Sequence, residues 1–214
     1  MRLLYLITNY CYPGQWPRVL STGYQPALGI DPDPKVGTTV GIHPRVAHLA
    51  DDGDLIRLER QLPFRRVVGL GEVGMEYQMA TDDHTRTQKM LLLAVQYQLP
   101  VVIQARRTEA GTDCLRIPQE VLPPSHQVHH HCFTGGAREL TAWAEAFPKC
   151  YLSISGTIRN NPSAAAKDVG AQIPGPRLLL ETDSPHLKPA RTSEGSPGDH
   201  YSQRQTLVPP LGHY

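Results

Sequence analysis

The sequence predicts an α/β fold, and within that class a TIM-type (β/α) barrel. Short apolar segments alternate with helical patterns at a spacing of roughly 30 residues, the size of one βαβ unit. There are about seven such segments, which favours a barrel over an open sheet. Acidic and histidine side chains directly follow several of them, where the exits of parallel strands would meet.

The predicted strands are short runs rich in β-branched and other apolar residues, a composition that suits parallel strands covered on both faces. The apolar start of the chain is interpreted as a strand rather than a signal sequence, because Asn9, Tyr10 and Pro13 follow it at once. The seven strands are expected to begin near Leu3, Val36, Val67, Val101, Val128, Tyr151 and Leu178.

Between the strands, apolar residues recur at helical spacing. Residues 88–98 and 139–147 each carry a one-sided apolar set, and Trp143 and Phe147 of the second set are expected in the core. Asn161 and Pro162 form a good helix start before residues 163–170. A weaker pattern over 55–62 predicts a helix before the strand at Val67.

Both ends of the chain differ from those of a complete barrel. No strand precedes the one near Leu3, and residues 190–214 are rich in Pro, Gly and Ser without an apolar period. We therefore expect an incomplete barrel domain over 1–189 and a disordered tail over 190–214. The gap would leave two strand edges unpaired. Either another segment fills it, or the chain is a fragment or alternative product of its gene.

Composition limits the classes of partner and compartment. The formal net charge is +1, so the whole-chain charge gives no electrostatic argument for nucleic-acid binding, although bound cations would supply local positive charge. The 4 cysteines form no CxxC pair, which is typical of reduced thiols in a cytoplasmic or nuclear protein. No apolar run approaches the ~20 residues of a membrane span. We expect a monomer.

Three metal-binding side chains stand at predicted strand exits: Glu72, His131 and Asp183. One polar site built across several strand ends is therefore predicted. Within the run 129–131, alternate side chains of a strand face opposite ways, so His129 and His131 share a face and His130 points away. Of the three histidines, only His131 is selected as a candidate ligand.

Five segments, in this order and spacing, resemble the TatD family of metal-dependent deoxyribonucleases, which are amidohydrolase-like TIM barrels. The resemblance extends from about Leu3 to Pro189. Within it, the amino-acid sequences of residues 9–13 and 129–135 are similar to those of an animal subgroup of the family. The segments are Gly41-Ile-His-Pro44, Gly71-Glu-Val-Gly-Met-Glu-Tyr77, Val102-Ile-Gln-Ala-Arg106, His131-Cys-Phe-Thr-Gly135 and Glu181-Thr-Asp-Ser-Pro185.

The resemblance implies a metal centre with catalytic carboxylates. Glu72 falls on the acid that bridges two metal ions, His131 on a histidine ligand, and Asp183 on the acid that ends the last strand. Asp183 would also accept the proton of the attacking water. Gln104 falls where the family has another histidine ligand, and its neutral amide is a weaker donor. The family's first strand, which carries a His-x-His metal-binding pair, has no counterpart here.

The resemblance also implies a substrate and a cofactor. Arg106 matches an arginine that would hold a phosphate oxygen, and His43 is assigned to substrate binding, with a structural role in a turn as its alternative. The expected metal is Mg²⁺, with Mn²⁺ or Zn²⁺ as alternatives. The expected substrate is DNA, as single strands or 3′ ends.

Two functions of different class follow. The first is a metal-dependent deoxyribonuclease that hydrolyses phosphodiester bonds. The second is a catalytically inactive relative without bound metal that binds nucleic acid or a protein, for which Gln104 and the absent first strand argue. A narrower third is an amidohydrolase-like hydrolase with another substrate, because this barrel supports many chemistries.

Overall fold

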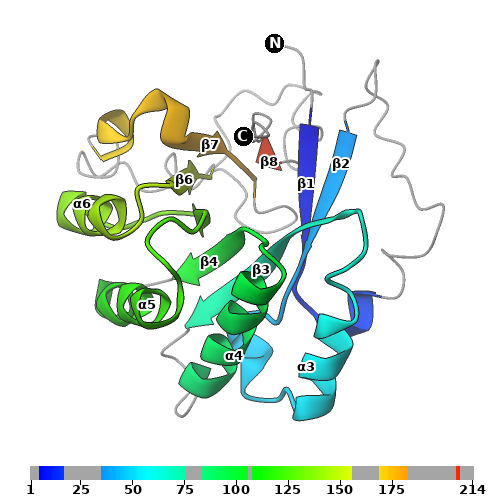
Figure 1. Ribbon diagram of the computed structural model, residues 1–214. Helices are drawn as coiled ribbons and strands as arrows, with labels where there is room; N and C mark the ends of the chain where they lie inside the picture. Colours follow the sequence, from blue (N-terminus) through cyan, green and yellow to red (C-terminus); the bar gives the residue numbers. More distant parts are fainter. Residues whose placement is uncertain are drawn as a thin grey trace, which may run out of the picture.

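Seven parallel strands follow one another in chain order around a curled sheet (Figure 1). The computed structural model describes residues 5–16, 35–75, 83–105, 108–155, 169–182 and 206–207. The predicted TIM-type barrel and all seven predicted strands are confirmed. The strands are β1 (Tyr5–Tyr10), β2 (Lys35–Val40), β3 (Val67–Met75), β4 (Val101–Ala105), β5 (Val128–His131), β6 (Cys150–Ile154) and β7 (Leu178–Leu180).

A two-residue strand, β8 (Thr206–Leu207), covers the gap left by the seven parallel strands. Leu207 pairs antiparallel with Leu6 of β1 and with Leu180 of β7. The two edges that we expected to be unpaired therefore both meet β8, which satisfies backbone groups that would otherwise be open. Both residues fall in the segment 190–214, where we expected no regular structure, and the rest of that segment lies outside the described residues.

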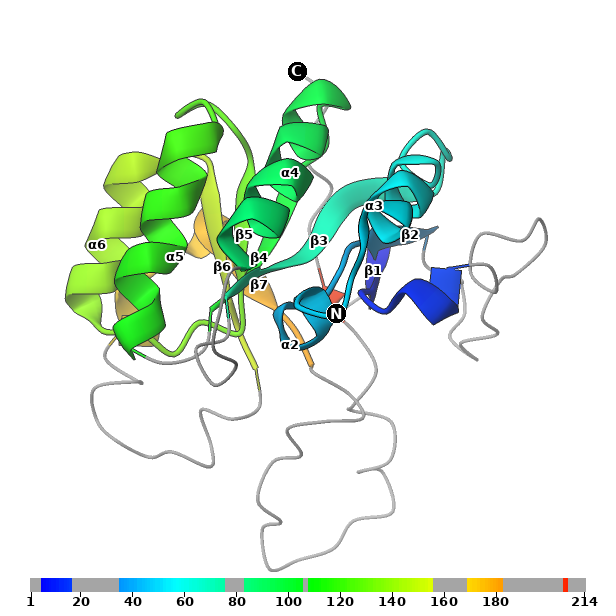
Figure 2. The same cartoon turned by 90° about the horizontal axis from the view of Figure 1, so that it is seen from below.

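The helices cover the outside of the sheet. They are α2 (Pro44–Ala47), α3 (Asp52–Glu59), α4 (Asp83–Gln96), α5 (Thr108–Val121) and α6 (Ala137–Ala146), with single turns η1 (Pro13–Gln15) and η3 (Gly175–Arg177). Figure 2 shows α4, α5 and α6 side by side along the sheet. Helices α3, α4 and α6 confirm predicted helices, whereas the helix predicted over 163–170 lies mostly outside the described residues. None of the described helices has both the length and the apolar character needed to cross a bilayer.

Helix α5 has no counterpart among the predicted helices. Pro118 lies inside it, and proline in a helix interior removes a backbone hydrogen bond and usually interrupts the helix. Cys114 and Ile117 are nevertheless fully buried, and α5 contacts β3 and β4. Packing of this apolar face against the sheet outweighs the local cost of the proline.

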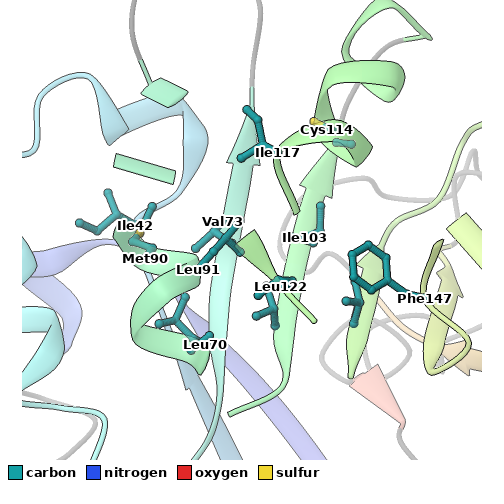
Figure 3. Packing of buried hydrophobic residues seen from close by; sticks show 14 of the residues in the cluster. Ile42, Leu70, Val73, Met90, Leu91, Ile103, Cys114, Ile117, Leu122 and Phe147 are labelled. Carbon is teal, nitrogen blue, oxygen red and sulfur yellow. The ribbon is translucent and has the colours of Figure 1, made fainter. Parts of the chain in front are cut away.

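The hydrophobic core lies between the sheet and its helices. Figure 3 shows Leu70, Val73 and Ile103 from the strands meeting Met90 and Leu91 of α4. The predicted core residues Trp143 and Phe147 are buried at 0% and 1% exposure. Successive residues of a strand face opposite sides of the sheet. Because these apolar side chains face the helices, the residues that alternate with them face the barrel interior.

Gly74 in β3 is a position where only glycine fits. Its φ is +153°, and a Cβ there would lie 2.0 Å from the backbone oxygen of Gln104 on β4. Gly74→Ala is therefore expected to lower the free energy of unfolding by at least about 1–3 kcal/mol, measured by urea denaturation. Gly14, with no atom near such a Cβ, is the matched control. A loss no greater than that of Gly14→Ala would contradict the close packing of β3 on β4.

Candidate metal centre

Polar side chains gather inside the barrel, toward the carboxyl ends of its parallel strands. Glu72 comes from β3, Gln104 from β4 and His131 from β5, and Glu181 follows β7 directly. Pairing places Gln104 opposite His131, so these two side chains lie at one level, whereas Glu72 falls in the register shift between Gly71 and Val73. Asp183 and Arg106 lie outside the described residues, and their roles stay predictions.

The carboxylate of Glu72 is buried and ringed by nitrogen donors. Asn9 donates its amide N–H to Oε1 at 3.0 Å, and Thr39 in turn donates its hydroxyl to the Asn9 oxygen. His131 Nε2 lies 3.5 Å from Oε1, and His43 Nε2 lies 3.6 Å from Oε2. The site thus brings together Glu72, His131 and His43. Asn9 was not among the predicted site residues, because an asparagine on an early strand carries no distinctive pattern.

His43 both caps the N-terminus of α2 and faces the Glu72 carboxylate. Its Nδ1 accepts the backbone N–H of Arg45 at 3.0 Å, which caps α2 and directs Nε2 toward Glu72. The ring of Tyr12 stacks on it, with centroids 5.7 Å apart. Contact of His43 with a substrate stays a prediction.

His131 lies between two buried carboxylates. Its Nε2 faces Glu72, and its Nδ1 is in close contact with Oε2 of Glu181. A neutral imidazole has one N–H and one lone pair, so it can donate to only one of two carboxylates. Two carboxylates beside one ring therefore favour either a doubly protonated ring or one proton and one cation. This is an environment that fits a bound metal ion.

A second histidine of the same strand shares this region. His129 Nε2 lies 2.7 Å from the Ser153 hydroxyl and 4.0 Å from Oε2 of Glu181. His130 faces the other way, against the rings of Phe133 and Trp143, which confirms the predicted alternation. The selection of His131 alone left out His129 and Glu181, although strand alternation places His129 on the same face as His131.

Burial and charge set the protonation of these groups. Burial lowers the pKa of His129 to about 3, so its ring is neutral near pH 7. Burial by itself would raise the pKa of Glu181, but the charge and hydrogen bond of His131 outweigh it and hold that pKa below its usual value. A neutral imidazole and an ionised carboxylate are the forms that bind metal ions.

Gln104 occupies the centre without a partner. Its side chain is buried at 3% exposure, and neither amide atom has a hydrogen-bond partner within the described residues. An unsatisfied buried amide costs about 1–3 kcal/mol, and such groups in a native structure commonly mark a place where a ligand, ion or water binds. The buried imidazole and carboxylate donors together suit a borderline divalent cation.

Comparison with known proteins assigns the family. The family model of TatD-related DNases matches residues 27–207. The chain is 33% identical over 165 residues to the 3′-5′ ssDNA/RNA exonuclease TatD of Edwardsiella piscicida, covering 71% of this chain and 58% of that protein. It is 29% identical over 154 residues to the human 3′-5′ RNA nuclease TATDN2, covering 70% of this chain and 20% of that protein. The chain thus spans 58% of the first of these relatives and 20% of the second, less than two thirds of either.

A solved structure agrees with the sequence comparison. The crystal structure of YjjV, a TatD homologue from Escherichia coli K12, aligns with a TM-score of 0.71 at 25% identity. The alignment covers 94% of this chain and 72% of YjjV. The barrel, the order of its strands and the family match agree, and the chain belongs to the family of TatD-related DNases.

Proposed function

We propose that this protein is a metal-dependent nuclease that hydrolyses phosphodiester bonds of single-stranded DNA from its 3′ end. The observation that carries the proposal is the buried pair of Glu72 on β3 and His131 on β5, 3.5 Å apart inside the barrel across the intervening strand β4. The relatives support the substrate class, because they are named as 3′-5′ nucleases of single-stranded DNA or RNA. We expect it to act as a monomer in the cytoplasm or nucleus.

Glu72, His131 and Asp183 would hold the metal, for which we propose Mg²⁺, with Mn²⁺ or Zn²⁺ as alternatives. A bound divalent ion neutralises phosphate charge and lowers the pKa of a water molecule. The protein holds the side chains that would bind the ion in a fixed orientation. Asn9 and Thr39 hold the Glu72 carboxylate in one orientation through consecutive hydrogen bonds. Well-oriented outer partners of this kind typically change metal affinity or activity by about 10–100-fold.

The remaining roles follow the geometry of phosphate hydrolysis. Asp183 would accept the proton of the attacking water, and Arg106 would donate two N–H groups to a phosphate oxygen pair. His43 caps α2 and faces Glu72, so it would orient that carboxylate and contact the substrate at the rim.

One observation favours a second candidate, an inactive relative that binds nucleic acid or protein. Gln104 stands at a position where the resemblance implies a histidine ligand, and an amide oxygen binds such metals more weakly than imidazole. This candidate predicts binding to single-stranded DNA with no metal-dependent cleavage.

The test is cleavage of a 5′-labelled single-stranded DNA, with RNA of the same sequence in parallel. Wild type with Mg²⁺ is expected to shorten the strand from its 3′ end, and both EDTA and Asp183→Asn are expected to abolish the reaction. If the folded wild-type chain binds the strand but never shortens it, the inactive candidate replaces the nuclease.

A further inference from the structure

We propose that His129, His131 and Glu181 form a second metal site, suited to Zn²⁺, on the inner side of His131. One ligand atom from each of the three residues lies within 4.8 Å of the others. The site uses neither the Gln104 position nor Asp183. It is therefore different from the one assigned to Glu72, His131 and Asp183 above, and its metal binding does not depend on the protein being a nuclease.

Metal binding requires small shifts of the side chains in both directions. Glu181 Oε2 and His131 Nδ1 lie closer than two ligands of one zinc ion and would move apart, whereas His129 Nε2 would move toward them. Zinc binds imidazole nitrogens and carboxylate oxygens at about 2.0–2.2 Å, so tetrahedral ligands stand roughly 3.3 Å apart. Glu181 Oε2 already contacts His131 Nδ1, and His129 Nε2 lies 4.0 Å from the same oxygen. To bind metal, His129 Nε2 gives up its contact with the Ser153 hydroxyl and turns toward Glu181.

Two of the three side chains are buried and the third, His129, is partly buried. His131 and Glu181 are 1% and 6% exposed. A cavity of about 50 Å³ inside the barrel reaches His129 but is lined by neither His131 nor Glu181, so the case for the site rests on the three side chains themselves.

The second ring nitrogen of His131 completes the arrangement. A metal on Nδ1 leaves the proton on Nε2, which faces Glu72 Oε1 at 3.5 Å. Ligating histidines commonly donate their other N–H to a carboxylate in this way. Because one neutral imidazole has a single lone pair, a metal on Nδ1 and a metal on Nε2 of His131 exclude each other.

The donor set selects the metal. Two imidazoles and one carboxylate are a known three-ligand set for zinc with one open position. Mg²⁺ prefers oxygen ligands in octahedral geometry and keeps several of its waters. The inner site is therefore expected to bind Zn²⁺ in the presence of millimolar Mg²⁺.

The experiment measures metal binding without substrate. Zn²⁺ affinity is determined by equilibrium dialysis against excess Mg²⁺, and Co²⁺ absorption reports the ligands. His129→Gln is expected to weaken Zn²⁺ binding by more than about 100-fold, since even outer partners of a metal are worth ~10–100-fold. His84→Gln, on α4, is the matched control and is expected to change nothing.

Ser153→Ala keeps all three ligands and removes only a hydroxyl that bonds His129 and Glu181, so it is expected to retain Zn²⁺ binding within about 10-fold of wild type. This variant tests the site even if His129→Gln fails to fold. Wild-type affinity in folded His129→Gln, loss of Zn²⁺ binding in folded Ser153→Ala, or a thiolate band in the Co²⁺ spectrum would each overturn the assignment. Because no substrate is present, a failure of nuclease activity leaves this result unaffected.

Discussion

Gln104→His is expected to raise both the metal affinity of the centre and metal-dependent cleavage by about 10-fold or more, on the scale by which neighbouring groups tune metal sites. Gln104 pairs in register with His131, so an imidazole there would project to the same level as the existing donors. It would replace a weak amide with a strong nitrogen donor. Mn²⁺ titration and single-strand cleavage measure the two effects.

Gln104→Leu is the control that separates metal binding from stability. It removes the unsatisfied buried amide, and is therefore expected to raise the free energy of unfolding by about 1–3 kcal/mol with no gain in metal affinity. If leucine increased cleavage as much as histidine does, the gain would come from stability, and the assignment of position 104 to the centre would be wrong.

Glu72→Gln is expected to reduce metal-dependent cleavage by at least about 100-fold, because it removes the charged oxygen that would bind the ion. The fold should persist, since the glutamine carbonyl can still accept the hydrogen bond that Asn9 donates to Glu72. Thermal denaturation monitors the fold, and initial rates on labelled single-stranded DNA monitor the activity.

Glu120→Gln provides the matched control. Glu120 is an exposed acid on α5 that pairs with Arg116, away from the barrel interior. Its neutralisation should leave cleavage unchanged. Equal rates in Glu72→Gln and wild type would contradict a role for Glu72 in the reaction.

Local patterns were enough to predict the barrel. Strands such as β4 and β5 are β-branched or apolar runs with clear borders, and α4 and α6 carry regular apolar stripes. Helix α5 was missed because Pro118 is an unfavourable local signal that burial of Cys114 and Ile117 overrides. Strand β8 was missed because two residues are too few to form a pattern.

The centre could be predicted only where each residue had its own local signal. Glu72 and His131 were predicted at strand exits, and the structure brings them within 3.5 Å, with His131 at the end of β5 but with β3 continuing past Glu72 to Met75. The approach of His129 to Glu181 could not be predicted, because it depends on the closure of β5, β6 and β7 into one curved sheet. The Asn9 contact with Glu72 likewise joins residues 63 positions apart, a separation that no periodicity encodes.

Binding of Mn²⁺ to the folded wild-type chain tests the central claim most directly, because every proposed role of Glu72 and His131 depends on a bound cation. Electron paramagnetic resonance measures the free ion as protein is added, with Glu72→Gln in parallel. Loss of the free-ion signal with wild type and its persistence with Glu72→Gln is the predicted result. Free Mn²⁺ undiminished by folded wild type would contradict a metal centre at this end of the barrel, and equal binding by both chains would contradict Glu72 as one of its ligands.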